Sequence, residues 1–199
     1  MDQSPYSKLA VGQWAERTAE LIDAHPLSKE EIVEIVLMAW EAIFDSRIGP
    51  REFQIETHIF PKPQIMGFFL HELIPLELAT RHPGEWRGDI TADEKDLVYL
   101  PRPEFSTEVK TSSHRTQIFG NRSYAQKPSD SKKSKGGYYL AVNFEKFEKG
   151  KSARPQIRRI RFGWLEHTDW IGQAAATGQQ AHLNPDSEGK KLLILYDAS

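Results

Sequence analysis

Two acidic residues and a lysine are spaced so that they could form one catalytic site. Residues i and i+2 of a β-strand point to the same face, so Glu108 and Lys110 project together if their segment is extended. Asp96 precedes another apolar stretch, and the 11 residues between Asp96 and Glu108 allow a hairpin that brings the two carboxylates together. Paired carboxylates can hold a hard cation such as Mg²⁺, which binds one or two carboxylates together with a substrate phosphate. Lys110 would then orient the attacking water or stabilise developing charge, so the pattern indicates metal-dependent phosphate-ester hydrolysis.

A simpler interpretation of Glu108 and Lys110 is an exposed ion pair that contributes less than about 1 kcal/mol. Three observations favour the catalytic interpretation: the pair lies in an expected strand, it follows Asp96 at hairpin distance, and it opens the most basic segment of the chain. Asp89 and Asp93 are alternatives to Asp96, but neither leads directly into an apolar strand.

Positive charge is concentrated in one part of the chain, although the net charge is only −2. Residues 110–161 contain 14 Lys and Arg against three acidic residues, and the remainder contains 12 against 25. Binding to a polyanion needs one basic face rather than a basic total, so this segregation is compatible with a nucleic-acid partner. A clustering of solvated lysines is the alternative.

Composition excludes several other classes of protein. The 199 residues contain no cysteine, which excludes disulfides, iron–sulfur clusters and Cys-ligated zinc. No His-x-x-x-His pair or Gly-rich phosphate loop is present, so neither a zinc site nor a nucleotide cofactor is expected. The sequence shows no apolar run long enough to span a bilayer and no signal-peptide pattern at its start, so we expect a soluble, cytoplasmic protein. We expect a single domain over residues 1–199, with residues 1–27 as an N-terminal helical appendage.

Helical patterns dominate the first part of the chain. Ser28 and Glu31 form a capping box, and apolar residues at helical spacing behind it predict an amphipathic helix over residues 29–44. A shorter helix is expected from Trp14, ending near Pro26, and an apolar helix over residues 63–79. Pro75 should kink this last helix or end its first half.

Alternating patterns follow from residue 95 onward. Strands are expected over residues 97–100, 105–112 (antiparallel to the first), 138–144 (central) and 157–164, with a last strand over 191–196. A helix is expected over residues 170–183, and a flexible basic loop over 126–137. These elements predict an α/β fold in which a mixed central β-sheet is flanked by helices.

The Asp-x(11)-Glu-x-Lys spacing resembles the signature of the PD-(D/E)xK nuclease superfamily. The resemblance implies that Asp96 and Glu108 bind Mg²⁺ and that Lys110 assists a water molecule in cutting a phosphodiester bond. It also implies a restriction-endonuclease-like core. The proline that usually precedes the first Asp of the signature is Lys95 here.

Longer blocks resemble the ScaI-type restriction endonucleases, and the resemblance covers about residues 28–196. The blocks are residues 60–68, 92–99, 108–114, 117–126 and 169–181. The resemblance implies a homodimeric Type II enzyme that uses Mg²⁺ to cleave double-stranded DNA at a short palindromic site, leaving 5′-phosphate and 3′-hydroxyl ends. Family members also carry a Glu on a core helix before the first strand, and Glu72 fits that position near the catalytic residues. A plain buried ion pair is the alternative role of Glu72.

Two other functions remain open at this point: a structure-specific or repair nuclease of the same superfamily, and a DNA-binding module whose Glu108–Lys110 pair is structural. DNA contacts are expected just past the catalytic strand, from residues whose side chains suit either base edges or phosphates. These residues are Arg115, Gln117, Asn121 and Arg122. In the basic loop, Lys132, Lys133 and Lys135 are expected to face phosphates, with a solvated loop as the alternative. Gln179 and Gln180 fit either a DNA groove or a helix surface, and we favour the surface.

Overall fold

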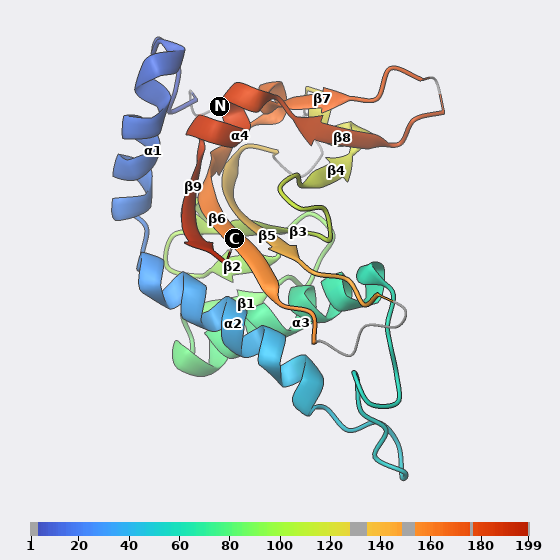
Figure 1. The fold of residues 1–199 in the computed structure, drawn as a ribbon. Helices are drawn as coiled ribbons and strands as arrows, with labels where there is room; N and C mark the ends of the chain where they lie inside the picture. The colour runs from blue at the N-terminus through green and yellow to red at the C-terminus, as the bar shows by residue number, and fades with distance from the viewer. Residues whose placement is uncertain (1–3, 128–134, 149–153, 176, 199) are drawn as a thin grey trace.

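A mixed six-stranded sheet forms the centre of the protein (Figure 1). The structure, a computed structural model, describes residues 4–127, 135–148, 154–175 and 177–198. The strand order is β1-β2-β3-β5-β6-β9; β3 and β5 are parallel, and all other neighbours are antiparallel. The strands are β1 (Trp86–Gly88), β2 (Leu97–Tyr99), β3 (Thr107–Ser112), β5 (Gly137–Phe144), β6 (Ile157–Leu165) and β9 (Leu192–Asp197). The mixed central sheet and the antiparallel pairing of its second and third strands are confirmed.

Two long helices, α2 (Lys29–Asp45) and α3 (Pro63–Arg81), pack beside each other against this sheet (Figure 1). The hydroxyl of Ser28 caps α2 by accepting a hydrogen bond from the Glu31 amide, as the capping box predicts. The main core joins these helices to one face of the sheet, which contributes Val109, Leu140 and Val142.

Helix α3 continues through Pro75 to Arg81, so the expectation that proline ends its first half is wrong. Pro75 removes one hydrogen-bond donor inside the helix, but the ring is buried, and packing around it holds the helix together. Helix α1 (Trp14–Asp23) lies against β6 and β9, and its Ile22 belongs to the main core. No helix in the described ranges is long and apolar enough to cross a membrane.

A second, three-stranded sheet lies over the other face of the central sheet. Its strand order is β4-β8-β7, all antiparallel, with β4 (Phe119–Asn121), β7 (Trp170–Gly172) and β8 (Gln180–Leu183). A small core between the two sheets combines Tyr139 and Ala141 of β5 with Trp170 and Leu183. Tyr138 and Leu140 of the same strand face the main core, as expected for period-2 alternation.

The helix expected over residues 170–183 is therefore wrong. Its alanines favour a helix locally, but Trp170, Ala181 and Leu183 are buried in the small core, and their strands pair through β8. A short helix, α4 (Pro185–Lys190), follows instead, capped by Asn184. Long-range pairing outweighs local propensity here.

Short 3₁₀ helices adjust the boundaries of several elements: η1 (Val11–Gln13), η2 (Pro103–Phe105), η3 (Arg122–Ala125) and η4 (His167–Asp169). Because η2 includes Phe105, β3 begins at Thr107 rather than at Phe105 as expected. The expected flexible loop lies mostly outside the described residues, which resume at Lys135, and β5 begins at Gly137.

Candidate active site

Glu108 is a buried carboxylate with two hydrogen-bond donors and a second ammonium group beside it. Its side chain is 3% exposed, on the face of β3 that looks toward the small sheet. Oε1 accepts a hydrogen bond from Lys110 Nζ at 2.7 Å and another from the hydroxyl of Tyr124. Lys95 Nζ lies 3.7 Å from Oε2 and 4.9 Å from the centre of the Tyr139 ring. Two ammonium groups, those of Lys110 and Lys95, therefore lie beside this buried carboxylate inside the protein.

Asp96 lies at the start of β2 and reaches the backbone of β3. Its Oδ2 accepts a hydrogen bond of 2.6 Å from the amide of Val109, the residue between Glu108 and Lys110. His71 of α3 lies on the same carboxylate, with Nδ1 3.8 Å from Oδ2. Burial lowers the pKa of His71, and Lys110 lowers it further, against the opposing effect of Asp96. The imidazole beside Asp96 is therefore favoured in its neutral form.

The structure brings Asp96, Glu108 and Lys110 together, as the spacing predicts. Lys110 is 13% exposed and also donates to the Val109 carbonyl at 3.1 Å. The alternative of an exposed Glu108–Lys110 ion pair is wrong, because both side chains are largely enclosed. Two carboxylates and an amine therefore surround the backbone of one residue, Val109.

Helix α3 can approach this strand because it has glycine at position 67. A Cβ atom added at Gly67 would lie 2.6 Å from Thr111 Oγ1, closer than such atoms pack. His71 follows one helical turn later and therefore faces the same strand. This close approach is what brings His71 to Asp96.

Glu72 is not in the expected buried setting. It lies on the exposed side of α3, between the exposed side chains of Phe68 and Leu76, whereas the buried side of the helix carries Leu70 and Ile74. A buried ion pair is therefore wrong for Glu72, and a part for Glu72 in catalysis stays a prediction. The preceding residue of the helix, His71, is the one that approaches Asp96.

Three residues of the cluster were missed by the sequence reasoning: Lys95, His71 and Tyr124. Lys95 occupies the position where the superfamily signature has proline, which was a signal that this position differs. Tyr124 lies within the 117–126 block but 16 residues from Glu108, and His71 precedes Glu108 by 37 residues. Only tertiary folding shows that these side chains belong to the site.

The oxygen donors of Asp96 and Glu108 are of the chemical type that hard divalent cations take. The described residues contain no group of three or more His, Cys, Asp or Glu side chains arranged for a metal. Mg²⁺ commonly takes one or two carboxylates and completes its shell with water and substrate phosphate, so Asp96 and Glu108 are a sufficient protein donor set. Their charges are balanced by Lys95 and Lys110. A divalent ion would make the cluster positive, which suits a phosphodiester.

The expected DNA-contacting residues are placed in different parts of the molecule. Asn121 ends β4 and is exposed, and Arg122 donates through its guanidinium to the carbonyls of Ala175 and Gly178 at 3.2 and 3.4 Å. Lys135 lies near the site, with Nζ 4.3 Å from the centre of the Tyr124 ring. Lys132 and Lys133 lie outside the described residues.

Arg115 and Gln117 lie in the connection between β3 and β4. Arg115 is exposed and lines a groove with Glu145, Arg158 and Asp197, apart from the small sheet. Gln117 is half-buried, and its carbonyl accepts a hydrogen bond from Asn143 at 3.0 Å. Their contacts with DNA stay predictions.

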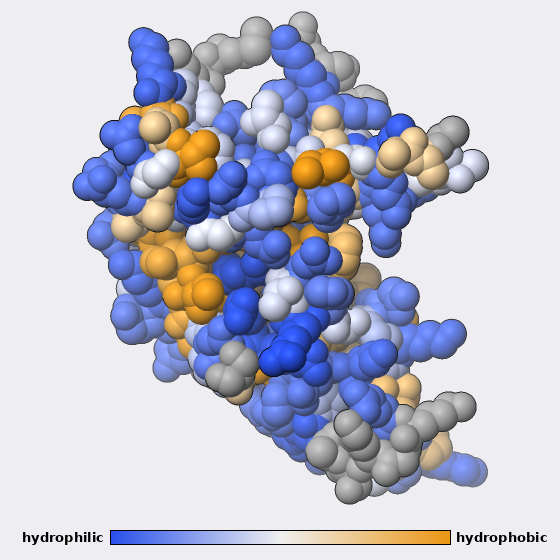
Figure 2. Space-filling view, turned by 45° about the horizontal axis from the view of Figure 1, so that its top comes forward, coloured by the Kyte–Doolittle hydropathy of each residue, from blue (hydrophilic) through white to orange (hydrophobic). Residues whose placement is uncertain are grey.

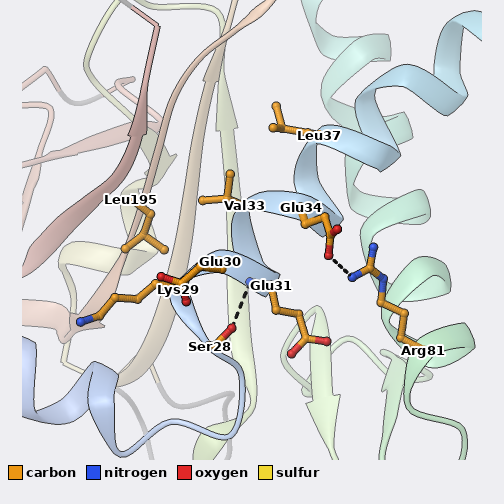
Figure 3. A pocket seen from close by; sticks show the side chains of 9 residues that line it. All are labelled: Ser28, Lys29, Glu30, Glu31, Val33, Glu34, Leu37, Arg81 and Leu195. Atoms are coloured by element: carbon orange, nitrogen blue, oxygen red, sulfur yellow. Dashed lines mark hydrogen bonds and ion pairs between the residues drawn. The ribbon is translucent and has the colours of Figure 1, made fainter.

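Figure 3 shows a separate pocket at the start of α2, away from this cluster. Its lining includes Glu30, Glu31 and Glu34, and Glu34 pairs with Arg81 at 2.6 Å. The same lining includes Lys29 and Arg81 but neither Asp96 nor Glu108, so this pocket is separate from the cluster around Val109.

Comparison with known proteins identifies the family. The family described as ScaI restriction endonuclease matches residues 4–196. The chain is also 50% identical over 194 residues to the Type II restriction enzyme ScaI of Streptomyces caespitosus, covering 97% of this chain and 85% of that enzyme. The matched range includes helices α1 to α4, strands β1 to β8 and most of β9, and every residue of the cluster around Val109. The chain belongs to the ScaI restriction endonuclease family.

Proposed function

We propose that this protein is a Type II restriction endonuclease that hydrolyses phosphodiester bonds in double-stranded DNA at a short palindromic site, leaving 5′-phosphate and 3′-hydroxyl ends. The observation that carries the proposal is the meeting of Asp96, Glu108 and Lys110 around Val109. It places the buried carboxylate of Glu108 and that of Asp96 at the same short stretch of β3 as an ammonium group, which is the donor set that metal-assisted hydrolysis of a phosphodiester needs. We assign the cluster to the PD-(D/E)xK superfamily.

Each residue has a distinct part in the proposed reaction. Asp96 and Glu108 would hold Mg²⁺, which would supply a bound water of lowered pKa and positive charge beside the reacting phosphate. Lys110, anchored on Glu108 Oε1, points its ammonium group toward the same region and stabilises the developing negative charge. Lys95 places a second ammonium group 3.7 Å from Glu108 Oε2.

The proposed active form is a homodimer that needs no nucleotide cofactor. A palindromic duplex has two-fold symmetry, and one chain carries one such cluster, so two copies would place one cluster on each strand. Arg122, Lys135 and the basic loop would supply the phosphate contacts that make binding dependent on salt.

Cleavage of DNA by point variants tests these roles. Asp96→Ala and Lys110→Ala should lower the rate of plasmid cleavage in Mg²⁺ by at least about a thousandfold while specific binding is kept, because they remove a metal ligand and the charge-stabilising group. Asp186→Ala and Lys190→Ala are matched controls, since this exposed pair of α4 lies away from the cluster, and they should cleave normally.

The outcome with wild-type protein separates the remaining functions. Discrete fragments from a long duplex support a site-specific enzyme, whereas a smear or cleavage only at junctions would favour a structure-specific nuclease. A protein that binds DNA but never cuts it, in Mg²⁺ or Mn²⁺, would overturn the enzymatic proposal. Near-normal turnover in either active-site variant would overturn the assigned roles.

A further inference from the structure

Three exposed side-chain amides form a row across the small sheet. Strand pairing places Asn121 of β4 opposite Gln180 of β8. On the other side of β8, Gly172 pairs with Ala181. The backbone N–H of the next residue, Gln173, donates to the backbone carbonyl of Gln180 at 2.9 Å. All three amide side chains are exposed. We call Asn121, Gln180 and Gln173 the amide row.

The opposite side of the small sheet is buried, which holds the row in place. Along β8, Gln180 is exposed, Ala181 is buried, and Leu183 is again buried. Beside Asn121, a Cβ atom added at Gly120 would lie 3.1 Å from the Tyr124 ring and 3.3 Å from the Trp170 ring. The sheet therefore rests directly on two aromatic rings and presents its amides on the side away from them.

The row is also connected to the catalytic cluster. Tyr124, which lies three residues after Asn121, donates its hydroxyl to Glu108. The backbone amide of Arg122 donates to the Gln179 carbonyl at 2.7 Å, and Arg122 holds the β7–β8 connection through Ala175. A DNA base bound at the amide row would therefore lie at a defined position relative to Glu108.

The outline of the molecule leaves the small sheet accessible. Figure 1 shows β7 and β8 side by side, extending away from the central sheet. Figure 2 shows mostly hydrophilic residues on the side in view, and its outline is concave on the right, below the projection at the upper right. An antiparallel β-ribbon of this kind fits the major groove of B-DNA.

We propose that the amide row contacts base edges in the major groove and selects adenine, an inference that rests on double-stranded DNA being the substrate. A carboxamide offers one acceptor and two donors in a plane, and it pairs in a bidentate manner with N6 and N7 of adenine. The row is uncharged, so it adds little to phosphate binding, which depends on Lys and Arg. Rows of residues about 5 Å apart across neighbouring strands can contact adjacent bases. Gln180, at the centre of the row, is thus a specificity residue rather than a surface residue.

Discrimination between DNA sequences tests this assignment. The cleavage site is first mapped from the fragment ends of a long duplex cut by the wild-type enzyme. The rate of cleavage is then compared between a short duplex carrying that site and duplexes in which each A·T pair is changed singly. In Gln180→Ala, the ratio of the cleavage rate on the site duplex to that on the changed duplex should fall about tenfold or more at one A·T position. The Mg²⁺ requirement of this variant, and its metal-free binding to a duplex without the site, should stay unchanged. Gln13→Ala, which alters an exposed amide of η1, should match the wild type.

A chemically altered base identifies the contacted atom. Replacing the adenine at that position with 7-deazaadenine removes the N7 acceptor and leaves Watson–Crick pairing intact. Wild-type binding should weaken about tenfold, and Gln180→Ala should show no further loss. A cleavage site without an A·T pair, unchanged discrimination in Gln180→Ala, or a loss of binding equal for all sequences would each overturn the inference. A wild-type protein that cuts no DNA would instead overturn the proposed function itself.

Discussion

The hydroxyl of Tyr124 and the ammonium group of Lys110 donate to the same oxygen of Glu108, and Lys110 Nζ lies 4.8 Å from the centre of the Tyr124 ring. Burial raises the pKa of Tyr124, and the charge of Glu108 raises it further, so the phenol stays protonated and remains a donor. Tyr124 therefore orients the proposed metal ligand and stacks against the amine that assists it.

Removal of this hydroxyl should weaken metal binding. In Tyr124→Phe the ring remains, so packing and the contact with Lys110 persist, but Glu108 loses one of the donors that fix its orientation. We expect the Mg²⁺ concentration for half-maximal cleavage to rise about fivefold to tenfold, and Mn²⁺ binding by calorimetry to weaken to the same extent, with DNA affinity in the absence of metal unchanged. Tyr138→Phe removes a hydroxyl that donates to the Leu21 carbonyl at 3.0 Å and serves as the control. Equal metal affinities in wild type and Tyr124→Phe would contradict the positioning role.

Any side chain at position 67 should disrupt the packing of α3 against β3. Gly67→Ala would force its new methyl group against Thr111 Oγ1 and push the helix, with His71, away from Asp96. Overpacking of this kind costs about 1–3 kcal/mol, which the higher helix propensity of Ala offsets only in part. Urea unfolding should show this loss, and cleavage should fall as well.

A second substitution tests the cause of that loss. Thr111→Ala removes the atom in conflict and should restore most of the stability of Gly67→Ala. Gly189→Ala lies in α4, where no atom is within 4 Å of the added methyl group, and it should be neutral or stabilising. A Gly67→Ala protein as stable and active as the wild type would show that α3 has room to move.

His25 should make the protein sensitive to acid. Its Nδ1 accepts from the Leu27 amide and its Nε2 donates to the Phe105 carbonyl, so the imidazole is neutral, and burial lowers its pKa to about 4. The unfolded chain takes up a proton below about pH 6.5, and the folded protein does so only near pH 4. The free energy of unfolding should therefore fall by about 3 kcal/mol as the pH drops from 7 to 4 through this residue alone.

Comparison with His25→Gln isolates this contribution. The variant starts from a lower stability at pH 7, because Gln does not fill the aromatic site around His25. Its free energy of unfolding, from urea denaturation at several pH values, should fall less steeply than that of the wild type between pH 6.5 and 4. Parallel pH profiles of the two proteins would refute the assignment to His25.

Lys191 should be essential for stability, in contrast with its neighbour. Its ammonium group is 2% exposed, lies 2.7 Å from Asp169 Oδ1, and is enclosed by the rings of Tyr6 and Trp14. Lys191→Met leaves the buried carboxylate of Asp169 without its cation and should cost about 3–5 kcal/mol in thermal or urea unfolding. Lys190→Met breaks only an exposed i,i+4 pair with Asp186 and should cost less than about 1 kcal/mol. Similar losses in the two variants would contradict a buried network.

The sequence alone predicted the elements in which local pattern and tertiary environment agree. Helix α2 has both a capping box and a regular apolar stripe, and β5 is apolar on both faces because both cores use it. The pairing of β2 with β3 followed from the short distance between them along the chain, so Asp96, Glu108 and Lys110 were predictable as a cluster.

Tertiary structure decided what sequence-local reasoning could not. Residues 170–183 contain alanines that favour a helix, yet they form β7 and β8, because pairing with β4 and burial of Trp170 and Leu183 outweigh a preference of a few tenths of a kcal/mol per residue. Likewise, the side chains of Lys95, His71 and Tyr124 converge on the two carboxylates from three different elements. Periodicity along a chain reports which face of an element is buried, but it carries no information about which distant element will cover that face.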